Sequence, residues 1–490
     1  MTQTQFLLLL ISIIPFTNCL FIKFWANSPR IINAASKLLP ILFLANLIGL
    51  YGNLDRDASY LILTEATRGI ALAFDVDQLA LGFLFCFNFL WLIFAFYSQR
   101  FLFLSEVKNV NNLRMFFALV FAFVNLIIIS KNLLSILFFY NCLIILCHFF
   151  STKFLHTNQT KFSRFFTSLL YLESIFFFLA IVATYKFTGQ IDFAVNGIVS
   201  EKLEPIQYLL LLTLYLSGLF FAILFPFYAL YRKINLDPLV IYSLFFLAYG
   251  LSTLYIFLKL LSSIFGFTIF SVIVAATGDG LFLDCIEWIF LINIIIASVF
   301  LFLSKGLKSS FFYLFFQQFI FVLFEIFIFV IFDESRVYLA LTSFLLSITL
   351  VFLCVSNFVL YLSKSEHKWL EGLFYNLKIT SILFIFGVAS LIGIAPSIGA
   401  MDKFFLLKII IQKKLLIPQI IFGVNFVSLL LFSWKVFFPL FIRQTEQSKG
   451  DEDLGREIDF DSSLILTTLI VALTMFLGLI LFPFLINLYE

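Results

Sequence analysis

The segment Leu391–Lys408, LIGIAPSIGAMDKFFLLK, places ionisable side chains directly after a predicted helix break inside an apolar run. Three residues interrupt helical hydrogen bonding: Gly393, Pro396 and Gly399. A lysine at the centre of a membrane helix costs about 2.5–3.5 kcal/mol, and broken backbone is tolerated where it lines a hydrated cavity. The pattern therefore predicts a functional site in which water and polar partners offset the cost of burying Lys403. Adjacent helical residues do not share a face, so Asp402 is expected to act elsewhere, at a helix end or against another chain.

Further polar side chains lie within apolar runs of the second half of the chain, where ionisable groups are functional candidates by default. The candidates for a proton path are Lys403, Gln318, Glu325, Lys408 and Glu287. Gln318 cannot titrate, but its amide can hydrogen-bond a water chain. Glu325 lies about two helical turns beyond Gln318, so both can face one cavity. The competing interpretations place Glu287 near a membrane interface and let Lys408 extend to the membrane surface.

The composition excludes a soluble globular protein. Hydrophobic residues make up 62% of the chain and charged residues 12%, whereas soluble proteins carry about 25% charged residues. The net charge of +3 is small and scattered, which argues against a nucleic-acid partner. The six cysteines form no CxxC pair, the three histidines lie far apart, and no Gly-rich phosphate loop is present. No metal site is predicted, and no nucleotide, flavin, haem or iron–sulfur cluster of the chain's own.

Apolar runs of membrane-spanning length predict about fourteen transmembrane helices. They are expected near residues 5–24, 33–51, 78–98, 114–130, 132–150, 164–187, 207–231, 238–259, 281–304, 310–332, 337–362, 379–411, 417–442 and 463–487. The short apolar segment 262–276 is expected to be part of a connection. Loops after odd-numbered helices carry more Lys and Arg, which places them on the matrix or cytoplasmic side and both termini on the opposite side.

Two of these helices carry a proline break, at Pro226 in the seventh and at Pro396 in the twelfth. Corresponding breaks in two halves are typical of inverted-repeat transporters. The predicted fold is therefore an all-α polytopic membrane protein with two inverted five-helix repeats and discontinuous helices 7 and 12. The predicted domains are N-terminal helices 1–100, a first repeat 114–260, a second repeat 281–442, an acidic loop 443–462 and a C-terminal helix 463–490.

The break segment resembles a known family. Residues 393–404, GIAPSIGAMDKF, are similar to the G-I-P-P-L-A-G-F-x-x-K-F motif of NADH dehydrogenase subunit 2, an antiporter-like membrane subunit of respiratory complex I. Residues 423–436 resemble the family's thirteenth helix, with Asn425 and Lys435 in register, and residues 308–319 put Gln318 at a histidine position. The resemblance covers roughly residues 305–440. A lysine in helix 12, rather than a glutamate, favours subunit 2 over subunit 4.

The first half departs from this family at its ionisable positions. Asn141 stands where the family has a glutamate in helix 5, and Phe221 where it has a lysine in helix 7. Tyr228 replaces a histidine, and Tyr249 replaces a lysine in helix 8. Asparagine and phenylalanine carry no exchangeable acid proton, so the first half-channel is expected to be degenerate. Glu173 in the predicted sixth helix is the alternative carboxylate.

The resemblance implies a non-redox core membrane subunit of the proton-pumping NADH:ubiquinone oxidoreductase that contributes to proton translocation through its second repeat. It implies no cofactor on this chain, with NADH, FMN, iron–sulfur clusters and ubiquinone in other subunits, and phospholipids and other complex I membrane subunits, especially related antiporter-like ones, as partners. The implied location is the mitochondrial inner membrane, with both termini in the intermembrane space. The alternatives are a free-standing cation/proton antiporter and a purely structural complex I subunit.

Overall fold

The chain folds into two compact units in the computed structural model. Unit 1 comprises Met1–Ala222 and Tyr242–Ala276, and unit 2 comprises Ile223–Ile241 and Thr277–Glu490. The structure describes residues 3–25, 28–52, 61–67, 70–105, 110–154, 160–194, 197–199, 205–221, 223–224, 246, 248–266, 281–304, 306–364, 371–442, 458–459 and 461–489.

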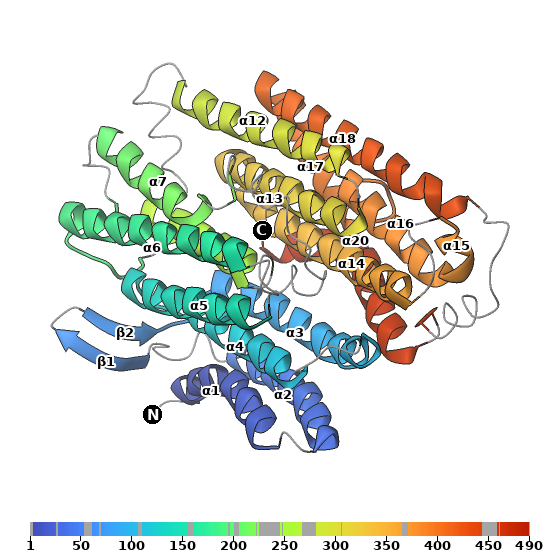
Figure 1. Cartoon of the computed structure of the whole chain (residues 1–490). Helices are drawn as coiled ribbons and strands as arrows, with labels where there is room; N and C mark the ends of the chain where they lie inside the picture. Colours follow the sequence, from blue (N-terminus) through green and yellow to red (C-terminus); the bar gives the residue numbers. More distant parts are fainter. Residues whose placement is uncertain are drawn as a thin grey trace. The chain divides into compact units, whose positions relative to one another are not determined.

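Unit 1 is a bundle of long apolar helices. Its described helices are α1 (Gln3–Phe24), α2 (Pro29–Tyr51), α3 (Gln78–Leu104), α4 (Val110–Ile128), α5 (Leu133–Phe154), α6 (Thr160–Thr188), α7 (Pro205–Phe220) and α10 (Leu251–Leu260), which continues into the π-helix η4 (Leu261–Phe265). Helices α4, α5, α6 and α7 pack in sequence order (Figure 1). Helix α10 packs against both α4 and α7.

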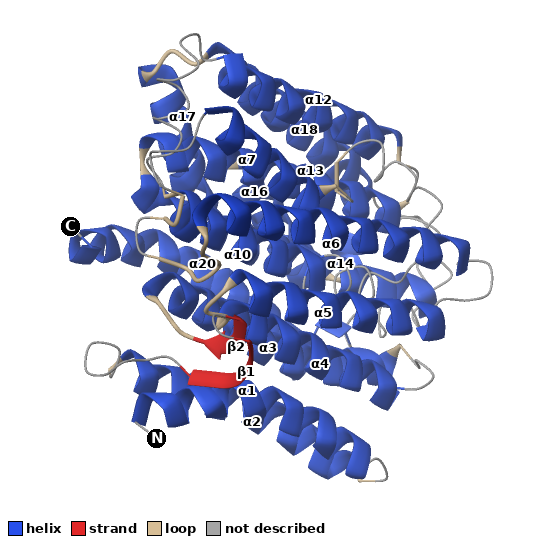
Figure 2. Ribbon diagram, turned by 90° about the vertical axis from the view of Figure 1, so that its left-hand side faces the viewer, coloured by secondary structure: helices blue, strands red, loops and turns tan. Residues whose placement is uncertain are grey.

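A two-stranded antiparallel hairpin, β1 (Leu61–Thr67) and β2 (Ile70–Phe74), departs from the all-helical prediction (Figure 2). The strand β2 is tied to the turn between α4 and α5, because Lys131 N donates to Ala73 O at 2.9 Å and Asn132 Nδ2 donates to Ala71 O at 2.7 Å. In the sequence, LILTEAT and IALAF are separated by Arg68 and Gly69, a weaker hairpin signal than Asn-Gly or Asp-Gly.

Unit 2 is also helical, and it contains the predicted break. Its described helices are α12 (Leu281–Leu303), α13 (Leu307–Phe332), the 3₁₀ turn η5 (Glu334–Arg336), α14 (Val337–Lys364), α15 (Leu373–Asn376), α16 (Lys378–Ile392), α17 (Ile398–Gln412), α18 (Leu416–Phe441) and α20 (Ser462–Tyr489). Helices α12, α13, α14 and α16 pack in sequence order, and α18 packs against both α12 and α16. This order of neighbours repeats that of α4, α5, α6, α7 and α10 in unit 1.

The described residues confirm a multi-pass helical membrane protein. They include 11 helices long and apolar enough to cross a membrane and three shorter apolar helices, at Ile206–Phe220, Lys378–Ile392 and Ser463–Gly478. Each predicted segment overlaps one of these helices, and the segment 379–411 also overlaps α17. Several boundaries differ from the predicted ones. Helix α3 continues to Leu104, α7 ends at Phe220, and residues 262–265 continue the helix that was expected to end at residue 259, because the π-helix η4 extends it. The remainder of the predicted 262–276 connection, apart from Gly266, lies outside the described residues.

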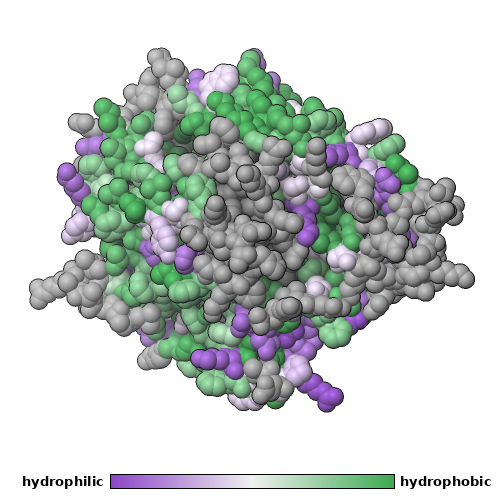
Figure 3. Space-filling view, viewed as in Figure 1, coloured by the Kyte–Doolittle hydropathy of each residue, from purple (hydrophilic) through white to green (hydrophobic). Residues whose placement is uncertain are grey.

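Apolar side chains stay exposed over broad parts of the described surface, as lipid contact requires (Figure 3). On α12, for example, Trp288, Ile292 and Phe302 are each more than half exposed. In contrast, α13 is buried along nearly its whole length. A helix that is apolar all round and enclosed by its neighbours is suited to hold a polar site away from lipid.

The end of the acidic loop is anchored to unit 2. Asp459 caps the start of α16, where its carboxylate accepts from Ile379 N at 2.9 Å, Thr380 N at 3.2 Å and Thr380 Oγ1 at 2.7 Å. Burial raises the pKa of the Asp459 carboxyl, and these hydrogen bonds offset part of that rise. Residues 443–457 lie outside the described residues.

Candidate functional site

The helix break lies where Gly393 and Pro396 predict it, whereas Gly399 lies in the first turn of α17. Helix α16 ends at Ile392, and Gly393 adopts a left-handed conformation with φ of 96° that few other residues tolerate. The chain resumes helical structure at Ile398, where the Ser397 hydroxyl caps α17 by accepting from Ala400 N at 3.3 Å. The break between α16 and α17 therefore comes from local sequence signals.

The two glycines also permit close packing across the break. A Cβ at Gly393 would lie 2.8 Å from Cγ of Lys403. A Cβ at Gly399 would lie 2.1 Å from the carbonyl oxygen of Ser390, which is closer than real atoms approach. Glycine at both positions therefore lets α16 and α17 meet and lets the Lys403 side chain pass the backbone.

Lys403 lies between two buried carboxylates. Its Nζ forms an ion pair with Glu325 Oε1 from α13 and donates to Asp402 Oδ2 at 3.1 Å. The Lys403 side chain is 11% exposed, that of Glu325 1% and that of Asp402 0%. Lys403 Nζ also lies 4.6 Å from the centre of the Phe321 ring, within the range of a cation–π contact. We call Lys403, Glu325 and Asp402 the charged triad.

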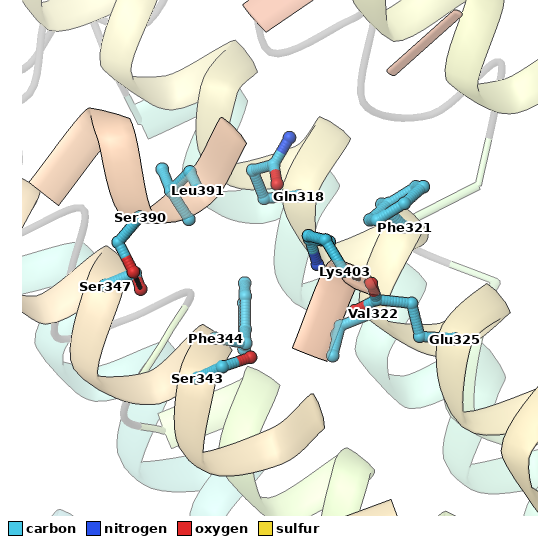
Figure 4. A pocket seen from close by; sticks show the side chains of 10 residues that line it. All are labelled: Gln318, Phe321, Val322, Glu325, Ser343, Phe344, Ser347, Ser390, Leu391 and Lys403. Carbon is cyan, nitrogen blue, oxygen red and sulfur yellow. Dashed lines mark hydrogen bonds and ion pairs between the residues drawn. The ribbon is translucent and has the colours of Figure 1, made fainter. Parts of the chain in front are cut away.

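A small cavity of about 10 Å³ adjoins the triad, which is about the space that one water molecule needs. Helices α13, α14, α16 and α17 all contribute lining side chains, and Figure 4 shows these side chains. Ser343 Oγ donates to Asp402 Oδ2 at 2.7 Å, and the hydroxyls of Ser347 and Ser390 lie 2.8 Å apart on the same cavity. The cavity lining therefore combines charged and polar side chains with the rings of Phe321 and Phe344.

Gln318 connects this cavity to a second group of polar side chains. Gln318 lines the cavity, and its Nε2 donates to Asn425 Oδ1 on α18 at 2.9 Å. Gln317 Nε2 donates to the same Asn425 oxygen at 3.2 Å and also to Ser428 Oγ. Both glutamines are buried. Polar side chains thus run from the triad across α13 to α18.

When all three groups are ionised, the triad has one net negative charge, because two carboxylates share one ammonium group. In the triad and the adjoining glutamine pair, three buried oxygens have no hydrogen-bond partner among the described residues: Glu325 Oε2, Asp402 Oδ1 and Gln317 Oε1. Buried polar atoms are otherwise almost always paired. An excess negative charge together with unused acceptor oxygens is suited to receive a proton.

The structure brings three of the five predicted proton-path residues together: Lys403, Glu325 and Gln318 line one cavity. Lys408 does not join them, because it lies on the exposed face of α17. Glu287 lies on α12 and is 8% exposed, but it is not part of this cavity.

The expectation for Asp402 is wrong. Asp402 is fully buried and contacts both Lys403 and Ser343. Adjacent Cα–Cβ bonds do point in different directions, but the long Lys403 side chain turns back far enough to reach its neighbour. The acidic residue next to the lysine was visible in the sequence, whereas the serines of α14 and α16 carried no signal.

Three residues of unit 1 stand where the family that the sequence resembles has ionisable side chains, and the structure shows what each of them contacts. Asn141 Oδ1 accepts from Ser174 Oγ at 2.7 Å, and the ring of Phe221 lies 6.0 Å from that of Phe176. The hydroxyl of Tyr249 contacts the Glu173 carboxyl. Pro226 and Tyr228 lie outside the described residues.

Comparisons with known proteins give matches at the level of structure. No protein-family model matches the chain, and no curated protein matches it by sequence. A chain of the Mrp complex from Dietzia sp. DQ12-45-1b superposes with a TM-score of 0.79 at 17% identity, covering 99% of this chain and 96% of that one. The two chains therefore share a fold.

Two further solved structures have a similar fold. A chain of the membrane-bound sulfane sulfur reductase, an archaeal respiratory membrane complex, gives a TM-score of 0.74 at 14% identity over 97% of this chain and 95% of that one. A chain of respiratory complex I from Thermus thermophilus gives 0.67 at 15% identity over 97% and 98%. All three likenesses span nearly the whole length of both chains, so the fold is shared over unit 1 and unit 2 alike.

Proposed function

We propose that this chain is an antiporter-like core subunit of a proton-pumping NADH:ubiquinone oxidoreductase and that it moves protons through unit 2. Two observations support the proposal. The motif at residues 393–404 resembles that of NADH dehydrogenase subunit 2, and the fold is that of chains from multi-subunit membrane complexes, respiratory complex I among them.

The charged triad carries the mechanism. With Glu325 ionised, Lys403 is shared between Glu325 and Asp402. A proton arriving at Glu325 Oε2, which has no partner among the described residues, neutralises this carboxyl and leaves Lys403 paired with Asp402. Loss of that proton restores the first arrangement. A buried lysine thus changes its main partner as a proton enters and leaves, and the small cavity gives room for a water beside it.

The remaining parts of the proposal follow from the resemblance. The chain performs no redox chemistry, and NADH, FMN, iron–sulfur clusters and ubiquinone belong to other subunits. Its partners are related membrane subunits and phospholipids, and its location is the mitochondrial inner membrane with both termini in the intermembrane space. The usual route through the first repeat is lost with the glutamate and lysine that Asn141 and Phe221 replace.

A free-standing cation/proton antiporter is the second candidate, because carboxylate oxygens that can take a proton can also take a small cation. Both Glu325 and Asp402 have an oxygen available for this among the described residues. Proton movement that requires sodium or potassium, in a chain that works alone in liposomes, would favour this candidate.

Substitution of Lys403 tests the proposed function. Lys403→Met removes the charge that the two carboxylates share, and Lys403→Arg keeps a charge that arginine does not release. We expect both variants to lower proton translocation by about tenfold or more, the scale of a positioned proton-transfer group. The matched control is Lys408→Met on the exposed face of the same helix, which should leave translocation unchanged. If Lys403→Met and Lys408→Met translocate protons at equal rates in assemblies of equal abundance, Lys403 carries no proton and the chain is a purely structural subunit.

A further inference from the structure

Glu173 forms a second buried acidic site, in unit 1. Its carboxyl lies on α6 and is 0% exposed. The hydroxyl of Tyr249, just before α10, lies 2.7 Å from Glu173 Oε1, and the hydroxyl of Tyr140 on α5 lies 3.5 Å from Oε2. Both tyrosines are buried. The helix α5 and the residues just before α10 thus each direct a hydroxyl to the carboxyl on α6.

The contact between α5 and α6 shows which of the two helices carries the acidic group. Asn141 stands next to Tyr140 on α5, and Ser174 stands next to Glu173 on α6. Ser174 Oγ donates to Asn141 Oδ1 at 2.7 Å. The amide on α5 therefore pairs with a hydroxyl of α6, and the acidic group of this pair of helices is on α6.

The oxygens around Tyr249 allow the protons to be counted. The Tyr249 hydroxyl oxygen lies 2.6 Å from the carbonyl oxygen of Leu219 and 2.7 Å from Glu173 Oε1. Both distances are those of full O–H···O hydrogen bonds. A phenol has one hydrogen to donate, and a backbone carbonyl has none. If Tyr249 donates to Leu219 O, the hydrogen in the other contact belongs to Glu173.

We propose that Glu173 is the proton-holding group of unit 1 and that it is kept as a neutral carboxylic acid which donates to the Tyr249 hydroxyl. Tyr249 is a positioning residue that accepts this hydrogen bond while it donates to Leu219 O. Tyr140 donates to the second carboxyl oxygen. When the site works, the O–H bond of the carboxyl breaks, water takes the proton, and the carboxylate is later reprotonated from water.

The protonation state can be measured without any transport assay. We would record infrared spectra of the full-length chain in phospholipid nanodiscs at neutral pH, in H₂O and D₂O, because a carboxylic acid has a carbonyl stretch that a carboxylate lacks. Glu173→Gln should remove one such band. Tyr249→Phe should shift it, since the acid loses its hydrogen-bond acceptor, and Tyr140→Phe should shift it less. An unchanged acid band in Glu173→Gln, with the variant still folded, would show that Glu173 is ionised and would overturn the proposal.

The transfer role rests on the proposed function, so a second experiment separates the two. Proton translocation by membrane vesicles carrying the assembled complex should fall by about tenfold or more in Glu173→Gln, the scale of a positioned acid–base group. Glu173→Asp should restore part of the rate. If Lys403→Met is normal while Glu173→Gln is impaired, the triad mechanism fails and the Glu173 site stands. Normal translocation in Glu173→Gln at equal assembly would overturn the transfer role, whatever the Lys403 variants do.

Discussion

At the scale of single residues, the triad shows both what side-chain type predicts and what it does not. Lys403 and Glu325 are costly inside a membrane, and that cost marked both as functional candidates without showing which partner each would contact. The structure pairs them. Asp402 was misjudged, because helical spacing describes Cβ directions and not the reach of a long side chain. Glu173 was noted only as an alternative carboxylate, since the two tyrosine contacts come from helices that are distant in sequence.

The triad also predicts how unit 2 responds to substitution. Lys403→Met leaves two buried carboxylates without their shared cation, and breaking such a buried pair typically costs about 3–5 kcal/mol. We therefore expect a clear fall in the melting temperature of the purified chain in nanodiscs. Lys403→Met combined with Glu325→Gln should regain part of that loss, because one of the two unpaired buried charges is removed. Additive losses in the double variant would show that the two side chains are not coupled.

At the scale of elements, the break between α16 and α17 was predictable from the sequence. The corresponding break at Pro226 stays a prediction. Gly393, Pro396 and Gly399 act within their own segment, so the sequence alone indicates the break. Helix α7 ends at Phe220, and Pro226 lies outside the described residues. The hairpin of β1 and β2 was not predicted, because its strands are much shorter than a membrane-spanning run and the first of them contains polar residues.

The glycines of the break offer a test with a matched control. Gly399→Ala would put a Cβ 2.1 Å from Ser390 O, so α16 and α17 must separate. A Cβ at Gly423 on α18 meets no atom within 4 Å, and alanine favours a helix over glycine by up to about 1 kcal/mol. We expect Gly399→Ala to lower both the melting temperature and proton translocation, and Gly423→Ala to preserve both. Equal stability of the two variants would contradict the close contact at Gly399.

At the scale of the whole molecule, the composition predicted a multi-pass helical protein, and the fold agrees over nearly the full chain with those of membrane-complex chains. Hydropathy fixes which segments are helical, because a membrane leaves few alternatives for the backbone. It does not fix which polar groups meet. The cavity of unit 2 and the acidic site of unit 1 both depend on contacts between helices far apart in the sequence.

The proposed assembly makes a prediction at this scale. The chain should migrate on native gels of mildly solubilised membranes in a complex far larger than 56.6 kDa, together with NADH dehydrogenase activity. Exposed apolar side chains on α12 and α18, such as Trp288 and Trp434, provide surface for lipid or neighbouring subunits. Migration as an isolated chain that still moves protons would instead favour the free-standing antiporter.

The central claim is that the charged triad of unit 2 carries protons, and Glu325→Gln tests it most directly. The substitution keeps the size of the side chain, leaves Lys403 its contact with Asp402, and removes only the group that binds the proton. The measurement is the number of protons moved per NADH oxidised by the assembled complex, at equal abundance of the variant and native chains. We expect a lower ratio with Glu325→Gln. A ratio equal to that of the native complex would contradict the claim.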